Sequence, residues 1–132
     1  MSTSHWTDKA AVVTGAARGQ GASFALGLIE QGARVLAVDA LPPDNAAWDT
    51  LKTAAAGHAG QLDTLVADVS TPACWQQVKA WLQDIDQTPW ALVNNAGITG
   101  QRATVTRTDL ADWERVMSVN LTGSMLGIQT VA

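Results

Sequence analysis

Short apolar runs alternate with longer stretches of helical spacing along this chain, which predicts strands that alternate with helices. Strands are expected at about 10–14, 34–39, 62–67 and 91–94. The run at 34–39 shows no polar alternation, which is typical of a parallel strand covered on both faces. Helices are expected over about 20–31 and 45–56, from Thr71 to near Pro89, from Thr108, and again over the last eight residues.

This order of elements predicts a single α/β domain over residues 1–132, with a doubly wound parallel sheet of the Rossmann type. In a complete sheet of order 3-2-1-4-5-6-7 the fourth strand is interior, whereas here it would lie at an edge. Helices that pack on the missing strands would also leave apolar surface bare. We therefore expect a chain that is marginally stable alone, and that forms homo-oligomers or needs a missing half.

A glycine cluster, Thr14-Gly15-Ala16-Ala17-Arg18-Gly19-Gln20-Gly21, joins the first strand to the first helix. Side chains at these glycines would hold the backbone away from a pyrophosphate, so the cluster indicates a dinucleotide-binding turn. The first amides of the helix and the positive end of its dipole would face the phosphates. Glycines also serve ordinary turns, and a structural turn is the alternative. No Gly-Lys-Ser/Thr follows, so the cluster is not a P-loop.

Asp39 stands at the end of the second strand, 18 positions after Gly21. An acid at this place accepts hydrogen bonds from both ribose hydroxyls of an adenosine. A 2′-phosphate would meet the carboxylate at close range, so NAD is the expected cofactor and NADP is less favoured. Arg18 could neutralise a 2′-phosphate, but only beside Asp39. The alternative is an Asp that begins the turn before Leu41-Pro42-Pro43.

Composition and charge argue against a nucleic-acid-binding, membrane-spanning or exported protein. With 47% apolar residues the chain can bury a core, while its net charge of −4 and the lack of a basic run argue against a nucleic-acid partner. No apolar segment approaches the length of a membrane span, and residues 1–9 lack the apolar core of a signal peptide. A soluble protein without a membrane partner is expected, and the cytoplasm is the default location.

The cysteine and the two histidines indicate neither a metal site nor a nucleophile. Cys74 is the only cysteine, and it shares a helical face with apolar residues, so a buried structural thiol is expected (Cys74, Val78, Trp81, Leu82 and Ile85). His5 and His58 are isolated in polar surroundings, without a second ligand at metal spacing, and are expected on the surface.

Two further motifs follow the last two expected strands: Asp68-Val69 after the third and Asn94-Asn95-Ala96-Gly97 after the fourth. Together with the glycine cluster and Asp39, in this order and at these intervals, they resemble the amino-terminal half of a classical short-chain dehydrogenase/reductase. The resemblance extends from Ala10 to the end of the chain. Separate motifs that agree in order are far less expected by chance than any one of them.

The resemblance implies an oxidoreductase that passes a hydride between NAD and a small alcohol or ketone. It implies that the cofactor contacts Thr14, Gly15, Ala17, Arg18, Gly19, Gln20, Gly21, Asp39, Asp68, Val69, Asn94, Ala96 and Gly97. Asp68 would bind the adenine amino group, assisted by the amide of Val69, and the Asn-Asn-Ala-Gly segment would lie along the nicotinamide-side ribose and steady the sheet. From the residues alone, Asn94 and Asn95 are turn formers at a strand end, an alternative that holds especially for Asn95.

Asn120 matches the catalytic asparagine of the family, which shapes a kink in its helix and holds a water of the proton relay. The alternative is an Asn or Gly that simply breaks the helix before Ser124. The family's catalytic Ser, Tyr and Lys come later in the sequence, and this chain contains no Tyr. We therefore expect a fragment that is inactive by itself, with a non-catalytic dinucleotide-binding half-domain as the alternative function. The substrate is not indicated by the sequence.

Overall fold

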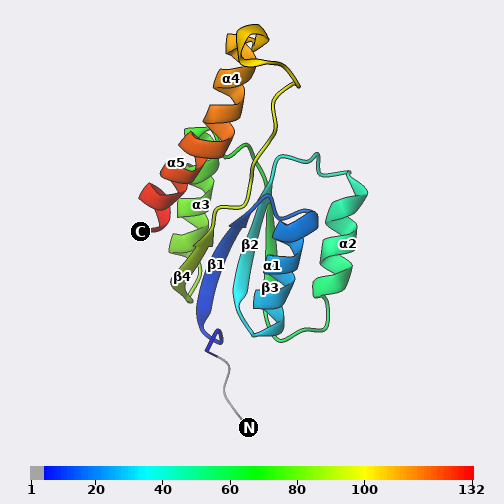
Figure 1. The fold of residues 1–132 in the computed structure, drawn as a ribbon. Helices are drawn as coiled ribbons and strands as arrows, with labels where there is room; N and C mark the ends of the chain where they lie inside the picture. The colour runs from blue at the N-terminus through cyan, green and yellow to red at the C-terminus, as the bar shows by residue number, and fades with distance from the viewer. Residues whose placement is uncertain (1–4) are drawn as a thin grey trace.

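The computed structural model describes residues 5–132, which form a four-stranded parallel sheet between two helical layers (Figure 1). The elements are β1 (Lys9–Thr14), α1 (Gly19–Glu30), β2 (Arg34–Asp39), α2 (Ala46–Ala55), β3 (Gln61–Val66), α3 (Pro72–Asp84), β4 (Thr88–Val93), a 3-10 turn (Val105–Arg107), α4 (Leu110–Met117), a π-helical turn (Ser118–Thr122) and α5 (Gly123–Val131). The strand order β3-β2-β1-β4 confirms the Rossmann-type sheet.

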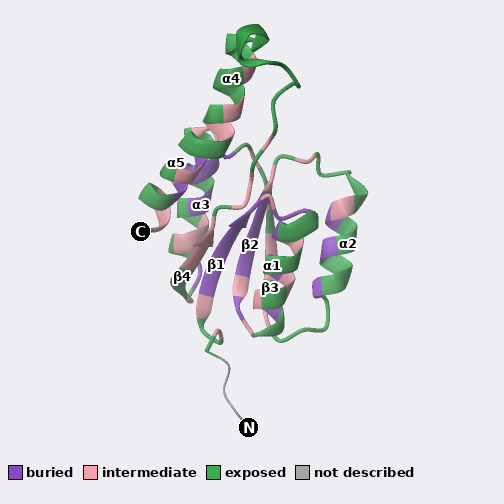
Figure 2. Cartoon of the chain, viewed as in Figure 1, coloured by how far each residue is buried: buried purple, intermediate pink, exposed green. Residues whose placement is uncertain are grey.

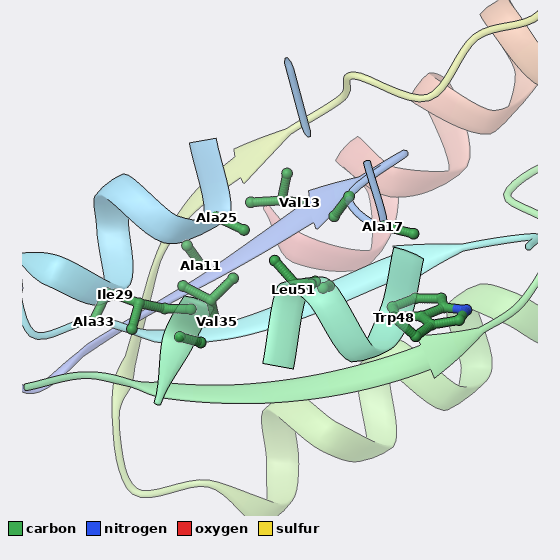
Figure 3. Packing of buried hydrophobic residues seen from close by; sticks show 12 residues of the cluster. Ala11, Val13, Ala17, Ala25, Ile29, Ala33, Val35, Trp48 and Leu51 are labelled. Atoms are coloured by element: carbon green, nitrogen blue, oxygen red, sulfur yellow. The ribbon is translucent and has the colours of Figure 1, made fainter. Parts of the chain in front are cut away.

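The core lies on both faces of β1 and β2, because alternate residues of a strand point to opposite sides. Val13 and Val35 pack toward α1 and α2, with Ile29, Trp48 and Leu51 among the buried residues of that layer (Figure 3). Other strand residues pack on the opposite face, in the layer of α3 (Val12, Leu36 and Val38). Figure 2 shows the two central strands as the most buried part of the sheet, which explains why residues 35–38 of β2 are all apolar.

The helix boundaries follow ordinary capping chemistry. Gly32 has φ +97°, the left-handed conformation that was expected to end the first helix. The Oγ1 atom of Thr71 accepts a hydrogen bond from the amide of Cys74 at 3.3 Å, and Pro72 occupies the first turn of α3. The cap expected at Thr71 is therefore confirmed.

Pro89 does not end a helix, which corrects the expectation from the sequence. The helix α3 ends at Asp84, and β4 starts at Thr88 and includes Pro89. Ala10 of β1 pairs with Pro89, whereas Ala11 pairs with Ala91, so Trp90 is an extra residue in the outer strand. A bulge on an edge strand tolerates the missing amide hydrogen of proline, and β4 is an edge of this sheet.

The last three helical segments form one continuous rod from Leu110 to Val131. Ser118 and Gly123 both have right-handed helical dihedrals, so the chain does not break before Ser124. A wide π-helical turn lies at Asn120 instead, and such turns are frequent at functional sites. The helix-break alternative is therefore wrong. Figure 1 shows α4 projecting beyond the carboxyl ends of the strands.

The rod carries exposed apolar side chains, which agrees with the expected bare surface (Leu110, Trp113, Met117, Leu121, Met125 and Ile128). Self-association through this surface stays a prediction. No helix in the described part of the chain has the length and apolarity needed to cross a membrane.

Candidate functional site

A cleft of about 470 Å³ opens where the carboxyl ends of the strands meet. Ligands gather at this edge of open α/β sheets because the loops diverge there. The walls come from the loop after each strand and from the π-helical turn. They comprise Gly15, Arg18, Gly19, Asp39, Ala40, Leu41, Ala67, Asp68, Val69, Asn95, Ala96, Gly97, Ile98 and Val119.

The glycine turn leaves room for a ligand at the start of α1. Gly19 has φ +61°, and a Cβ atom built on it meets nothing within 4 Å, so the space beside it is open. Arg18 precedes the helix without a side-chain capping bond, and the first turn contains no acidic residue. The positive end of the helix dipole thus faces the cleft without a carboxylate from its own first turn.

Gly21 is required for close packing and does not leave room for a ligand. It is buried in α1, and a Cβ atom there would collide with the main-chain carbonyl of Gly15. Gly15 itself has φ +62°, and its own Cβ atom would come within 2.9 Å of the Cα of Ala96. The two glycines therefore let α1, the end of β1 and the loop after β4 approach one another closely.

Asp39 is held against the glycine turn by two main-chain amides. The amide of Ala17 donates to Oδ2 at 3.1 Å, and the amide of Leu41 donates to Oδ1 at 3.0 Å. A carboxylate offers about four acceptor positions, so each oxygen retains capacity for another donor. The side chain is only partly buried and lines the cleft.

Asp68 and Val69 form the opposite wall. Oδ1 of Asp68 accepts hydrogen bonds from the amide and hydroxyl of Ser70, at 2.9 and 2.7 Å. Its Oδ2 accepts none from the described residues. The carbonyl of Val69 accepts a hydrogen bond from Nε1 of Trp75 at 2.8 Å. The wall is thus braced by its own turn and by α3.

Cys74 lies beneath this wall and is buried, as expected. Burial, with a contribution from the negative charge of Asp68, raises the pKa of the Cys74 thiol to about 11. A thiol that stays protonated at neutral pH is a poor nucleophile, so Cys74 has the properties of a structural residue. His5 and His58 are exposed. The described residues contain no group of three or more His, Cys, Asp or Glu side chains placed to hold a metal ion.

Thr14 and Asn95 lock the glycine turn to the end of β4. Oγ1 of Thr14 accepts the amides of Asn95 and Ala96 at 3.1 and 3.0 Å. In return, Nδ2 of Asn95 donates to the carbonyls of Thr14 and Gly15 at 3.1 and 3.2 Å. Thr14 is only 2% exposed, so it shapes the cleft through Asn95 and Ala96 rather than by lining it.

Asn94 and Asn95 point to different layers. Nδ2 of Asn94 donates to the carbonyl of Ser124 in α5 at 3.4 Å, and Asn94 is not part of the cleft lining, whereas Asn95 is. The resemblance implies a contact of the backbone of this segment with the cofactor, which the direction of the Asn94 side chain does not test, so a role of Asn94 at the cofactor stays a prediction. The alternation of side chains along β4 predicts this difference. Leu92 packs in the α3 layer and Val93 in the α1 layer, so Asn94 is expected on the α3 side and Asn95 on the α1 side.

Asn120 clamps the loop after β4 to the helical rod. Its Oδ1 accepts the amide of Ile98 at 2.8 Å, and its Nδ2 donates to the carbonyl of Ile98 at 2.9 Å. Ile98 and Val119, on either side of this clamp, line the cleft. The site thus joins four loops and one helical turn.

Comparisons with known proteins agree with this architecture. The family model described as short chain dehydrogenase matches residues 9–132. The chain belongs to the short-chain dehydrogenase family. It is 36% identical, over 123 residues, to the 3-alpha-(or 20-beta)-hydroxysteroid dehydrogenase of Mycobacterium tuberculosis, covering 93% of this chain and 45% of that protein. It is 32% identical to the levodione reductase of Leifsonia aquatica, covering 98% of this chain and 48% of that protein.

Solved structures show the same fold. The structure of NAD⁺-bound xylitol dehydrogenase superposes with a TM-score of 0.82 at 26% identity, over 96% of this chain and 48% of that one. The structure of levodione reductase superposes with a TM-score of 0.84 at 30% identity, over 96% and 49%. This chain thus spans about half the length of the relatives that it matches.

The structure brings together most, but not all, of the residues that the sequence marked. Those that line the cleft are Gly15, Arg18, Gly19, Asp39, Asp68, Val69, Ala96 and Gly97. Those outside its lining are Thr14, Ala17, Gln20, Gly21, Asn94 and Asn120. Sequence reasoning does not identify Ala40, Leu41, Ala67, Ile98 and Val119, and it includes Asn95 only within the Asn-Asn-Ala-Gly segment. Most of these residues are next to a predicted site residue in the sequence, and this proximity is the feature that could have identified them.

Proposed function

We propose that this chain is the NAD-binding half of a short-chain dehydrogenase/reductase that acts on a small alcohol or ketone. The observation that carries the proposal is the carboxylate of Asp39, which two main-chain amides hold at the rim of the cleft beside the glycine turn. NAD supplies the nicotinamide ring, which exchanges a hydride with the carbinol or carbonyl carbon of a substrate.

The residues of the cleft fit this cofactor. The open space at Gly19 and the uncapped start of α1 suit a pyrophosphate. Asp39 would hold the adenosine ribose, and Asp68 with Val69 would hold the adenine. Ala96 and Gly97, which line the other side of the cleft, would border the nicotinamide-side ribose.

The charge at Asp39 supports NAD over NADP. A 2′-phosphate next to an ionised carboxylate is repelled, and two main-chain amides hold the Asp39 carboxylate in place at the cleft. Arg18 is exposed at the same cleft and is the side chain that could offset this repulsion. The NAD⁺-bound xylitol dehydrogenase of the same fold supports this choice.

Asn120 is proposed as the catalytic asparagine of the complete enzyme. Its side chain is already engaged by Ile98, and it lies in the distorted turn of the rod. The 132 residues contain no Tyr, so we infer that this chain alone binds the dinucleotide and does not run the proton transfer of the family.

An NADH titration followed by tryptophan fluorescence tests the proposal. Trp48 donates a hydrogen bond to the carbonyl of Leu41 at 3.1 Å, and Trp75 donates one to Val69, so a buried indole contacts each wall. Saturable quenching is expected. The dissociation constant for NADH derived from it should rise at least tenfold in Asp39→Ala. Asp86→Ala, an exposed carboxylate in the loop before β4, is the matched control and should behave like the parent chain. A folded parent chain without saturable quenching would contradict the proposal.

A further inference from the structure

The indole of Trp75 lies between one wall of the cleft and the helical rod that carries Asn120. Trp75 is 3% exposed, and its Nε1 atom donates to the carbonyl of Val69 at 2.8 Å. At the far edge of the ring, a Cβ atom built on Gly127 would come within 2.8 Å of Cη2. One rigid side chain therefore contacts both the cleft wall and α5.

The backbone of α5 also rests directly on Val69. A Cβ atom built on Gly123 would come within 2.9 Å of Cγ2 of Val69 and 3.1 Å of its carbonyl oxygen. Gly123 and Gly127 are four residues apart, so they lie on one face of the helix. Gly123 and Gly127 have no side chains that could adjust, and this face packs on Val69, on the Trp75 ring and on Oδ1 of Asn94.

The turn that precedes this face contains Asn120. It comes three residues before Gly123, within the same continuous rod, and its amide group makes both hydrogen bonds to Ile98. A displacement of the Gly123–Gly127 face by the Trp75 ring would move the Asn120 clamp with it. The contacts thus run from Val69 through Trp75 and α5 to Ile98, which also lines the cleft.

We propose that Trp75 is a positioning residue that couples the Val69 wall to the Asn120–Ile98 clamp. Its hydrogen bond fixes the carbonyl of Val69, and its ring sets the distance between that wall and α5. A nucleotide that orders Val69 would then also order the clamp. This nucleotide linkage rests on the proposed function, whereas the packing of Trp75 between Val69 and Gly127 does not.

Hydrogen exchange of the Ile98 amide, which donates to Asn120, tests the coupling without any ligand. Trp75→Phe keeps an aromatic ring but removes the N–H donor. Trp81→Phe is the matched control, because Trp81 lies on the same helix and its Nε1 donates to Asp63, away from the cleft. Exchange at Ile98 should rise about tenfold in Trp75→Phe alone, the scale of one lost hydrogen bond to a buried carbonyl. Equal rates in the two variants, or a uniform rise along the chain, would overturn the proposal.

The NADH arm separates this proposal from the proposed function. With the parent chain, NADH should slow exchange at Ile98, and Trp75→Phe should bind it about tenfold more weakly while Trp81→Phe is unchanged. A parent chain that does not bind NADH contradicts the proposed function, and the ligand-free exchange still decides the role of Trp75. NADH binding that is equal in the two variants contradicts the linkage.

A second variant covers the case in which Trp75→Phe fails to fold. Gly127→Ala keeps the indole and presses on its ring and on Oδ1 of Asn94 from α5, and Gly27→Ala, which has open space around it, is the control. Gly127→Ala should raise exchange at Ile98 relative to Gly27→Ala. Unchanged exchange in Gly127→Ala would overturn the proposal.

Discussion

The main-chain amide of Ala17 donates a hydrogen bond to Oδ2 of Asp39 at 3.1 Å, although 22 residues separate them in sequence. The bond joins the glycine turn after β1 to the end of β2. Asp39 therefore faces the start of α1 as a consequence of folding, and main-chain donors hold its carboxylate in position. This arrangement is the physical basis for the NAD preference proposed above.

Neutralising Asp39 should relax the choice between the two dinucleotides. In Asp39→Asn, we expect the ratio of the NADPH to the NADH dissociation constant to fall about tenfold, since repulsion of a 2′-phosphate by a partly exposed charge is worth about 1–2 kcal/mol. Calorimetric titration of both nucleotides measures the ratio.

Asp68→Asn is the control for that experiment, because it removes a carboxylate from the opposite wall of the same cleft. It should weaken the binding of both nucleotides without changing the ratio of their dissociation constants. An equal change of ratio in the two variants would show that net charge, and not the position of Asp39, sets the preference.

Two glycines of α1 should respond oppositely to the same substitution. Gly21→Ala places a methyl group against the carbonyl of Gly15 and should lower the free energy of unfolding by about 2–4 kcal/mol. Gly27→Ala meets nothing within 4 Å and should raise it by about 0.5–1 kcal/mol, because alanine loses less backbone entropy in a helix. Urea unfolding measures both. A stable Gly21→Ala chain would contradict the close approach of α1 to the end of β1.

The hydroxyl group of Thr14 should contribute more to the free energy of unfolding than its methyl group does. Thr14→Val leaves the amides of Asn95 and Ala96 without their acceptor at a buried site, which should cost about 2–4 kcal/mol of unfolding free energy. Thr14→Ser keeps the acceptor and should cost less than half as much. Chemical denaturation of the pair decides this, and equal losses would indicate that packing rather than hydrogen bonding fixes the turn.

The Cys74 thiol should be inert in the folded chain. Its pKa of about 11 lies above the value of about 8.5 for an unfolded cysteine, so the folded state favours the protonated form. The stability that this thiol contributes is complete below about pH 8.5 and is lost as the pH rises toward 11. A thiol reagent at pH 8 should label Cys74 only after denaturant is added; rapid labelling of the native chain would contradict its burial.

Much of the fold could be predicted because its signals are local. The unbroken apolar run places β2 at Arg34–Asp39, and the cap at Thr71 with Pro72 marks the start of α3. Pro89 was misinterpreted because the bulge that accommodates it depends on pairing with β1, which is not encoded nearby in sequence. A distortion at Asn120 is implied only by the family resemblance, and in the structure Asn120 lies in the π-helical turn and bonds to Ile98.

The contacts that support the walls of the cleft were less predictable from the sequence than the position of Asp39. Asp39 was found from its distance to the glycine turn, whereas Trp48 and Trp75 brace the walls through carbonyls that only the tertiary structure brings near. Trp75 is buried beside Cys74, although the helical spacing in the sequence indicates a buried face through Cys74 and Val78 without it. Asn94 and Asn95 could have been separated by continuing the alternation of β4.

Mapping NADH on the folded chain by two-dimensional amide NMR tests the central claim most directly. The account predicts saturable shifts for the amides of residues 15–19, 39–41, 67–69 and 95–98, which form the cleft, and none for those of 52–63, which border a second cleft at the opposite end of β3. Shifts confined to 52–63, or a spectrum that NADH leaves unchanged, would contradict a dinucleotide site at the carboxyl edge of this sheet.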